Sequence, residues 1–153
     1  MSDQRYREEA NRCYESAQDE LDSGAILLMH KKHYHACFHA HQAILQALTA
    51  AWYAHNRVAG NETGPGLIRH LGDVDNKIFL KFKTFLPDVE KIERSLPLFL
   101  PNSRIESFDL PGIHPGKEFA KKDSEFFIDT AYKILAEVKT VLAKQGIGEK
   151  SET

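Results

Sequence analysis

The chain has 153 residues, a length that favours one domain over two. Hydrophobic residues make up 42% and charged residues 27%, which is the composition of a globular protein and excludes wholesale disorder. The formal net charge of -2 argues against a protein whose main task is to grip bulk nucleic acid or an anionic membrane.

Two cysteines, Cys13 and Cys37, are too few for the disulfide framework of a small secreted domain. The charged N-terminal segment has no apolar run behind it, so no secretory signal is expected. The longest clean apolar stretch covers residues 25–29, far fewer than the roughly 20 residues that span a bilayer. We therefore expect a cytoplasmic protein with no membrane segment.

The first half of the chain predicts two long helices. Apolar residues recur at spacings of three and four from Tyr6 to Leu28, which indicates an amphipathic helix over residues 3–30. A second helix is predicted over residues 33–57, where alanines allow a neighbouring backbone to approach closely. Because the junction between the two is short, they should form an antiparallel hairpin.

The second half predicts a kinked third helix, a loop and a last helix. The segment VAGNETGPG, residues 58–66, breaks regular structure, and a helical period then continues to residue 96 with a kink or restart near Pro87. Residues 97–115 hold four of the six prolines and predict a long loop, of a length that is often functional. The last helix is predicted over residues 123–144, with Asp123 or Ser124 as its N-cap.

No strand-like alternation persists in the sequence, so the predicted class is all-α. The expected arrangement is an antiparallel up-and-down bundle of four main helices, with a short extra helix after Pro87. It forms a single domain over residues 1–145, followed by a frayed C-terminal tail over residues 146–153.

The segment YHACFHAHQAILQALTAAW, residues 34–52, carries a family resemblance. It resembles the second helix of the HEPN family (higher eukaryotes and prokaryotes nucleotide-binding domains), where a tyrosine and a run of small and aromatic residues precede a His-Gln-Ala block. In this chain His41 and Gln42 open that block. Shorter matches in family-like order extend the resemblance over roughly residues 8–143, and it implies a HEPN-like helical bundle.

The chain departs from the family pattern at positions that matter for activity. The ribonuclease branch of the family, which works without a metal, uses an Arg followed by a His after four to six intervening residues. Here nine residues separate Arg104 from His114, and Arg69 is adjacent to His70, so no pair has the required spacing. The resemblance, together with this departure, favours a non-catalytic module over a ribonuclease.

The resemblance implies that this module binds a nucleotide or RNA, or acts as the companion subunit of a small nucleotidyltransferase in a toxin–antitoxin-like or defence-related system. No cofactor is expected beyond a nucleotide ligand. An alternative is a HEPN-type ribonuclease with a displaced active site, in which Arg104 works with His114 or His70.

A second alternative is a metal-binding helical protein, because histidines crowd the segment HKKHYHACFHAH. His33, Cys37 and His41 follow one stripe of the predicted helix, and imidazole with thiolate is a ligand set suited to zinc. His35 and His39 lie on a different face. A dedicated site needs further ligands, and the sequence has neither HExxH nor CxxC, so core packing is favoured over zinc.

Several residues are candidates for contact with a nucleotide or RNA. His41 lies among apolar neighbours, where a buried imidazole needs a partner and can mark a site, although a satisfied core histidine is the commoner case. Gln42 lies on the polar boundary and could read a base edge, and basic residues before the last helix could cradle a phosphate. The full candidate set is His41, Gln42, Arg69, His70, Arg104, Lys117 and Lys121.

Self-association is predicted from the second helix. It carries alanines such as Ala40 on one side and Phe38, Leu45 and Trp52 on the other, so it is apolar over more than half its circumference. Such a helix must be buried on both sides, within the bundle or against a second copy. We expect a two-fold homodimer, the alternative being that the loop over residues 97–115 covers the excess.

Overall fold

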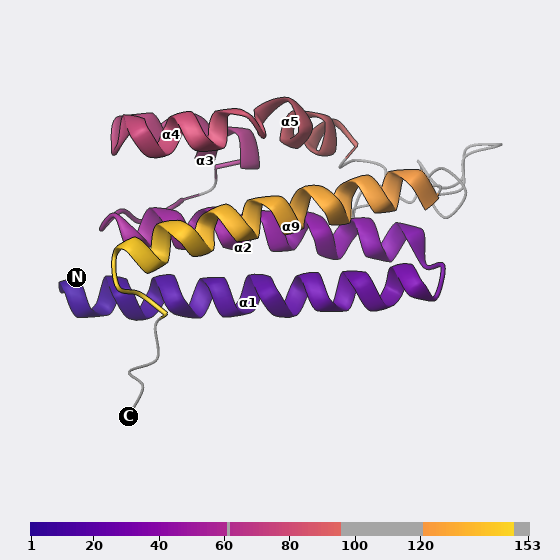
Figure 1. The fold of residues 1–153 in the computed structure, drawn as a ribbon, viewed down its shortest axis with the longest axis horizontal. Coiled ribbons are helices and arrows are strands. Elements are labelled where there is room, and N and C mark those ends of the chain that lie inside the picture. The colour runs from indigo at the N-terminus through magenta and orange to yellow at the C-terminus, as the bar shows by residue number, and fades with distance from the viewer. Residues whose placement is uncertain (61, 96–120, 149–153) are drawn as a thin grey trace.

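Figure 1 shows a bundle of long and short helices that run alternately in opposite directions. The computed structural model describes residues 1–60, 62–95 and 121–148 of the chain. The regular elements within these residues are helices, so the predicted all-α class is confirmed. In chain order they are α1 (Asp3–Met29), α2 (His33–Ala54), α3 (Gly64–His70), the 3-10 helix η1 (Leu71–Asp73), α4 (Asn76–Lys83), α5 (Leu86–Arg94) and α9 (Lys121–Lys144).

The predicted antiparallel up-and-down arrangement is also confirmed. α1 and α2 form a hairpin, the short helices α3 to α5 cover the opposite side of α2, and α9 returns alongside α2 (Figure 1). α9 thus packs on α2, with α1 on one side of it and α4 and α5 on the other.

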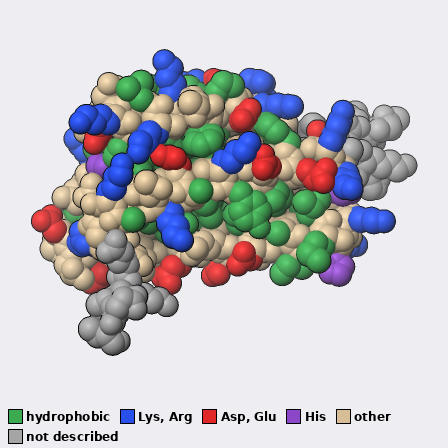
Figure 2. All heavy atoms as spheres, viewed as in Figure 1, with side chains coloured by type: hydrophobic (Ala, Val, Ile, Leu, Met, Phe, Trp, Pro, Cys, Tyr) green, Lys and Arg blue, Asp and Glu red, His purple; other side chains and the backbone are tan. Residues whose placement is uncertain are grey.

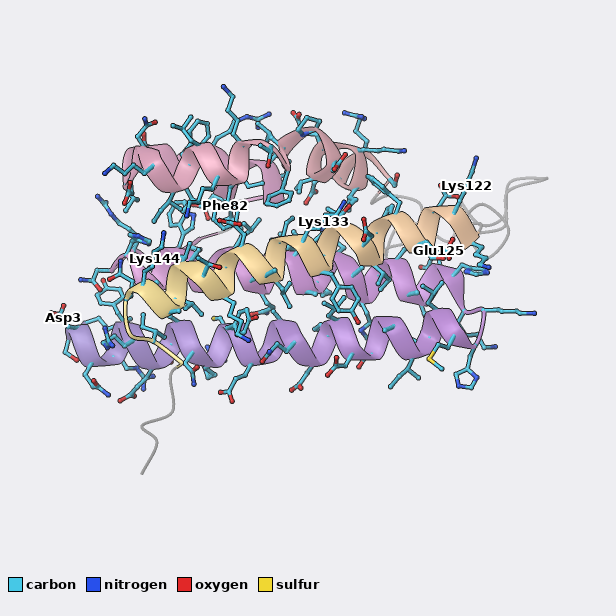
Figure 3. The ribbon with its side chains drawn as sticks, viewed as in Figure 1. Asp3, Phe82, Lys122, Glu125, Lys133 and Lys144 are labelled. Atoms are coloured by element: carbon cyan, nitrogen blue, oxygen red, sulfur yellow. The ribbon has the colours of Figure 1, made fainter. Side chains whose placement is uncertain are left out.

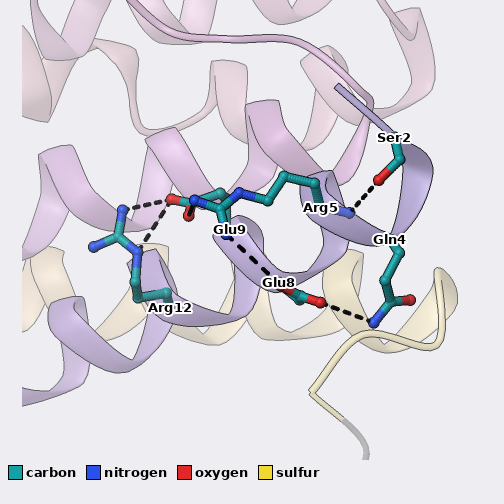
Figure 4. A network of polar contacts seen from close by, with 6 residues as sticks. All are labelled: Ser2, Gln4, Arg5, Glu8, Glu9 and Arg12. Carbon is teal, nitrogen blue, oxygen red and sulfur yellow. Dashed lines mark hydrogen bonds and ion pairs between the residues drawn. The ribbon is translucent and has the colours of Figure 1, made fainter.

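α1 begins where the sequence supplies a cap and pairs of opposite charge (Figure 4). Ser2 Oγ accepts a hydrogen bond from the Arg5 amide at 3.2 Å, which satisfies one of the free amides of the first turn. Glu9 accepts a hydrogen bond from Arg12 Nε at 3.1 Å and pairs with Arg5 at 3.3 Å. These contacts explain why the helix starts at the predicted residue.

Small residues let α1, α2 and α9 approach one another closely. Ala36 and Ala40 of α2 have no exposed surface, and Gly24 of α1 is buried opposite them. A Cβ at Gly24 would lie 2.9 Å from Ile128 Cδ1 and 3.3 Å from the Ala36 carbonyl oxygen. A larger residue at this crossing would therefore force the helices apart.

The apolar side chains that were expected on an outer face of α2 pack, wholly or in part, against the core of this chain. Trp52 is 8% exposed, and its Nε1–H donates to the Leu67 carbonyl oxygen at 3.0 Å. Phe38 and Leu45 are half-buried and pack against the core. Trp52 is thus covered by this chain itself, whereas Phe38 and Leu45 are covered only in part. The loop over residues 97–115, the alternative cover, lies outside the described residues.

The third member of the bundle is a series of short helices, where the sequence predicted one kinked helix. α3 starts inside the segment expected to break structure, because Thr63 Oγ1 accepts a hydrogen bond from the Gly66 amide and Pro65 fits the first turn. Asp75 caps α4 by accepting from the Lys77 amide at 2.9 Å, which separates α4 from η1. The restart predicted near Pro87 is confirmed as the first turn of α5.

Phe82 holds this third layer to the rest of the bundle. The side chain has no exposed surface, and Figure 3 shows it reaching from α4 into the space above α9. Val89 and Ile92 of α5 are buried in the same core. Each such side chain contributes roughly 1.5–3 kcal/mol on burial, which is enough to keep short helices folded.

α9 starts earlier and its C-terminal end is better anchored than predicted. It includes Lys121, so Asp123 and Ser124 lie inside the helix rather than at its N-cap. At the other end, Arg7 of α1 donates to the carbonyl oxygens of Gln145 at 2.7 Å and Gly146 at 2.9 Å. Ile147 is buried, so the fraying expected from residue 146 is wrong for residues 146–148. Residues 149–153 lie outside the described part.

Candidate functional site

His41 has a defined partner in the interior. Its Nε2 is hydrogen-bonded to Glu93 Oε1 at 2.9 Å, with side chains that are 4% and 15% exposed. The same Glu93 oxygen accepts from the Gly64 amide at 3.3 Å, so the contact joins α2, α3 and α5. Burial alone raises the pKa of Glu93, but the hydrogen bond and charge of His41 and the Gly64 amide outweigh it, so the pKa is lowered.

The histidines and the cysteine considered as metal ligands each contact a different neighbour. His33 Nδ1 is hydrogen-bonded to Ser124 Oγ of α9 at 2.9 Å, and His39 Nδ1 to Glu20 Oε2 of α1 at 2.7 Å. His35 is exposed and packs edge-on against the ring of Tyr34.

Cys37 is fully buried, and its burial, with Asp123 nearby, raises the pKa of the thiol to about 12. A thiol with that pKa is protonated at neutral pH, whereas zinc binds the thiolate. Over residues 1–60, 62–95 and 121–148, no three His, Cys, Asp or Glu side chains form a group that could hold a metal ion.

Within the described part of the chain, the residues predicted to bind a nucleotide do not form one cluster. Arg69 pairs with Glu90 at 2.6 Å, and His70 lies beside Trp52, with ring centroids 6.2 Å apart. Lys121 is exposed at the start of α9, at the end of the bundle where His33 meets Ser124.

Arg69 and His70 lie near the Trp52 end of α2, and Lys121 lies near its His33 end. The stretch of α2 between His33 and Trp52 separates them by roughly 29 Å, at about 1.5 Å per residue. Gln42 is half-buried near the middle of α2. Arg104 and Lys117, with His114 of the ribonuclease alternative, lie outside the described residues.

The structure instead gathers lysines where α4 lies along α9, and we call Lys77, Lys81, Lys133 and Lys144 the lysine face. Figure 2 shows basic side chains spread over these two helices, and Figure 3 labels Lys133 and Lys144 on α9. Lys81 Nζ lies 3.9 Å from Glu137 Oε1, which places α4 and α9 in register. Lys77 precedes Lys81 by one turn on the same side of α4.

Two lysines of this face lie close enough to influence each other's charge. The pKa of Lys144 is lowered chiefly by the interaction of its amine with the neighbouring Lys81 amine and by the repulsion between two positive charges. No local sequence pattern indicates this pair, since its members come from helices far apart along the chain. The sequence does indicate part of the lysine face, because Lys77 and Lys81 are four residues apart and therefore lie on one side of a helix.

The fold is therefore that of an all-helical bundle whose core histidine is hydrogen-bonded to Glu93 and whose α4–α9 side carries the lysine face. A profile of the HEPN domain matches residues 5–141, and the chain belongs to this family. Among the described residues, no helix combines the length and the apolar character that a membrane crossing needs.

Among solved structures, the chain is similar to the protein TT1696 from the bacterium Thermus thermophilus, with a TM-score of 0.67 and 23% sequence identity. The alignment covers 86% of this chain and 97% of that one, so the two proteins share a fold over nearly their whole length. No curated protein matches the chain.

Proposed function

We propose that this HEPN protein is a non-catalytic module that binds the phosphates of a nucleotide or RNA on the lysine face. The observation that carries the proposal is the packing of α4 on α9, where Lys81 Nζ lies 3.9 Å from Glu137 Oε1 and close to Lys144, so that lysines of two helices share one exposed surface. A phosphate between them would relieve their repulsion and accept hydrogen bonds from both. Lys77 and Lys133 extend the basic surface along α4 and α9, as a backbone with several phosphates requires.

The interior contacts support a binding role over a catalytic one. His41, the residue of the family-like helix best suited to acid–base work, is enclosed with Glu93 inside the bundle. Arg69 pairs with Glu90, and the ring of His70 lies beside Trp52. General acid–base chemistry needs an ionisable group within hydrogen-bonding reach of the substrate, which an enclosed imidazole does not provide.

The proposal is tested by fluorescence anisotropy and calorimetry with three probes: ATP, a short single-stranded RNA and inorganic phosphate. Replacing both Lys81 and Lys144 by Gln should weaken binding of the favoured probe at least tenfold. The matched control replaces Lys31 and Lys32 by Gln. Both lysines are exposed in the α1–α2 turn, so this variant loses the same positive charge at a site away from the lysine face. Equal loss in the two double variants, or no binding of any probe by the native chain, would overturn the proposal.

Salt dependence separates the ligand classes. For single-stranded RNA the logarithm of affinity falls with the logarithm of salt concentration by about 0.7 per neutralised phosphate. Removing Lys81 and Lys144 should therefore reduce that slope by about 1.4 if each lysine contacts a phosphate. An ATP site instead shows tight binding of ATP and no gain from a longer RNA.

The companion role toward a small nucleotidyltransferase, in a toxin–antitoxin-like or defence-related system, is a second proposal that rests on the family resemblance. Co-purification of the native chain from its host tests it, with a nucleotidyltransferase identified in the eluate as the supporting result. Cleavage of an RNA panel tests the ribonuclease alternative. RNA cut by the native chain and spared by Arg104→Ala would favour that alternative over the binding module.

A further inference from the structure

Glu137 lies within the lysine face, between the two lysines that α9 contributes. It follows Lys133 by one turn and precedes Lys144 by two turns on the same side of the helix. Figure 3 labels both lysines on α9, with α4 above them in the view. From α4, Lys81 Nζ reaches to 3.9 Å from Glu137 Oε1. The surface that we assign to phosphates therefore already holds a negative charge.

The Glu137 carboxylate has room for a closer hydrogen-bond donor. An amine and a carboxylate that share a direct hydrogen bond are about 2.7–2.9 Å apart, whereas Lys81 Nζ stays 3.9 Å from Glu137 Oε1. The Glu137 side chain is 29% exposed, against 64% for Asp129 on the same helix, so packing restricts it to the seam between α4 and α9. A ligand on the lysine face can therefore donate a hydrogen bond to a well-placed carboxylate.

The lysine face thus presents positive donors on both sides of a negative acceptor. Lys133 and Lys144 stand on either side of Glu137 along α9, and Lys81 approaches it from α4. A ligand fits this order if its phosphates lie on the amines and a hydroxyl group lies on the carboxylate. A ligand that offers phosphates alone places a negative charge beside Glu137 and is repelled there.

RNA and DNA differ in this property. The backbone of RNA carries a 2′-hydroxyl between successive phosphates, and this group can donate a hydrogen bond. The backbone of DNA has no hydrogen-bond donor within the chain. In dinucleotide-binding folds, a carboxylate that accepts a hydrogen bond from the 2′-hydroxyl recognises the ribose. The Glu137 carboxylate has the same chemistry, and it lies among amines that attract the neighbouring phosphates.

We propose that Glu137 accepts a hydrogen bond from a ribose 2′-hydroxyl and so makes the lysine face selective for ribose over deoxyribose. This inference rests on the proposed binding of phosphates to that face, and it narrows the ligand class to RNA or a ribonucleotide. The lysines supply an attraction that every nucleic acid shares, whereas Glu137 supplies a contact that only a ribose satisfies.

Two pairs of ligands test the preference of the full chain. Fluorescence anisotropy compares single-stranded RNA and DNA of one sequence, and calorimetry compares ATP with dATP. The ribose member should bind about fivefold more tightly, the effect of one typical hydrogen bond. A preference in the first pair identifies RNA as the ligand, and a preference in the second pair alone identifies a ribonucleotide. Equal affinities within both pairs would overturn the inference.

A chemical variant of the RNA separates the hydroxyl group from the shape of the sugar. RNA with 2′-fluoro sugars keeps the sugar pucker of RNA but lacks the donor, so it should bind like DNA. If 2′-fluoro RNA binds as tightly as RNA, the preference comes from backbone shape and the role of Glu137 is refuted.

Variants of the chain assign the preference to its residue. Glu137→Ala should bind both members of a pair more tightly, because a negative charge is lost, and should abolish the preference for ribose. Glu137→Gln keeps an uncharged acceptor and should retain part of it. Asp129→Ala is the matched control, because it removes an exposed carboxylate beside Lys133 on the same helix and should leave the preference unchanged. A preference that persists in Glu137→Ala would contradict the assignment.

The inference and the proposed function can fail separately. Binding that depends on Lys81 and Lys144 but is equal for ribose and deoxyribose would retain the lysine face as a phosphate site and remove the role of Glu137. No binding of any probe would overturn both.

Discussion

The contact between His41 and Glu93 should be among the most sensitive positions in the bundle. Glu93→Ala removes the acceptor at 2.9 Å from His41 Nε2 and at 3.3 Å from the Gly64 amide. The imidazole is only 4% exposed, so water cannot easily replace the lost partner. Hydrogen bonds to charged groups contribute about 1.5–3 kcal/mol, and we expect a loss of about 2–3 kcal/mol in the free energy of unfolding.

Chemical denaturation followed by circular dichroism measures this loss, and thermal unfolding should show a Tm lowered by about 5–10 °C. Glu90→Ala is the matched control one turn earlier on α5, because the pair of Glu90 with Arg69 is far more exposed. Such surface pairs contribute about 0–1 kcal/mol. If Glu93→Ala and Glu90→Ala lower the free energy of unfolding by the same amount, the interior contact does not hold α2, α3 and α5 together.

The pH dependence gives an independent check of the same contact. The pKa of Glu93 is lowered from its ordinary value of 4.5, so the folded state favours the ionised carboxylate. A lowered carboxyl pKa stabilises the fold above pH 4.5, and that stabilisation is lost as the pH falls through the folded-state pKa. The difference between the native chain and Glu93→Ala should therefore shrink below pH 4.5. A difference that grows on acidification would contradict this assignment.

Three further outcomes follow from the packing. Phe38→Glu should unfold the chain, since Phe38 packs against the core. If the variant is instead a folded monomer, Phe38 belongs to an interface between two copies. Arg7→Ala should cost about 1 kcal/mol by removing the two bonds that anchor residues 145–146, whereas Arg5→Ala, which loses only pairs within α1, should cost less. Burial raises the pKa of both Cys13 and Cys37, so neither should react with a thiol reagent at pH 8 until the chain unfolds, and rapid labelling of the native state would refute their burial.

The sequence predicted those parts of the fold that depend on local signals. The spacing of apolar residues in α1 and α9 repeats over many turns, so each helix was placed within two residues at either end. Between Thr63 and Arg94 the structure depends on single caps at Thr63 and Asp75, which are weak signals beside a continuing apolar period. The spacing of apolar residues predicted one long helix in this segment, whereas the caps begin separate short helices.

The contacts around the candidate site depend on residues that are distant in sequence. The apolar stripe of α2 correctly indicated that His41 is buried, but no local pattern indicates Glu93, which is 52 positions away. The pairing of Lys81 with Lys144 likewise requires the packing of α4 on α9. Residue types within one helix can predict which side faces the core, whereas partners on other helices follow only from the three-dimensional arrangement.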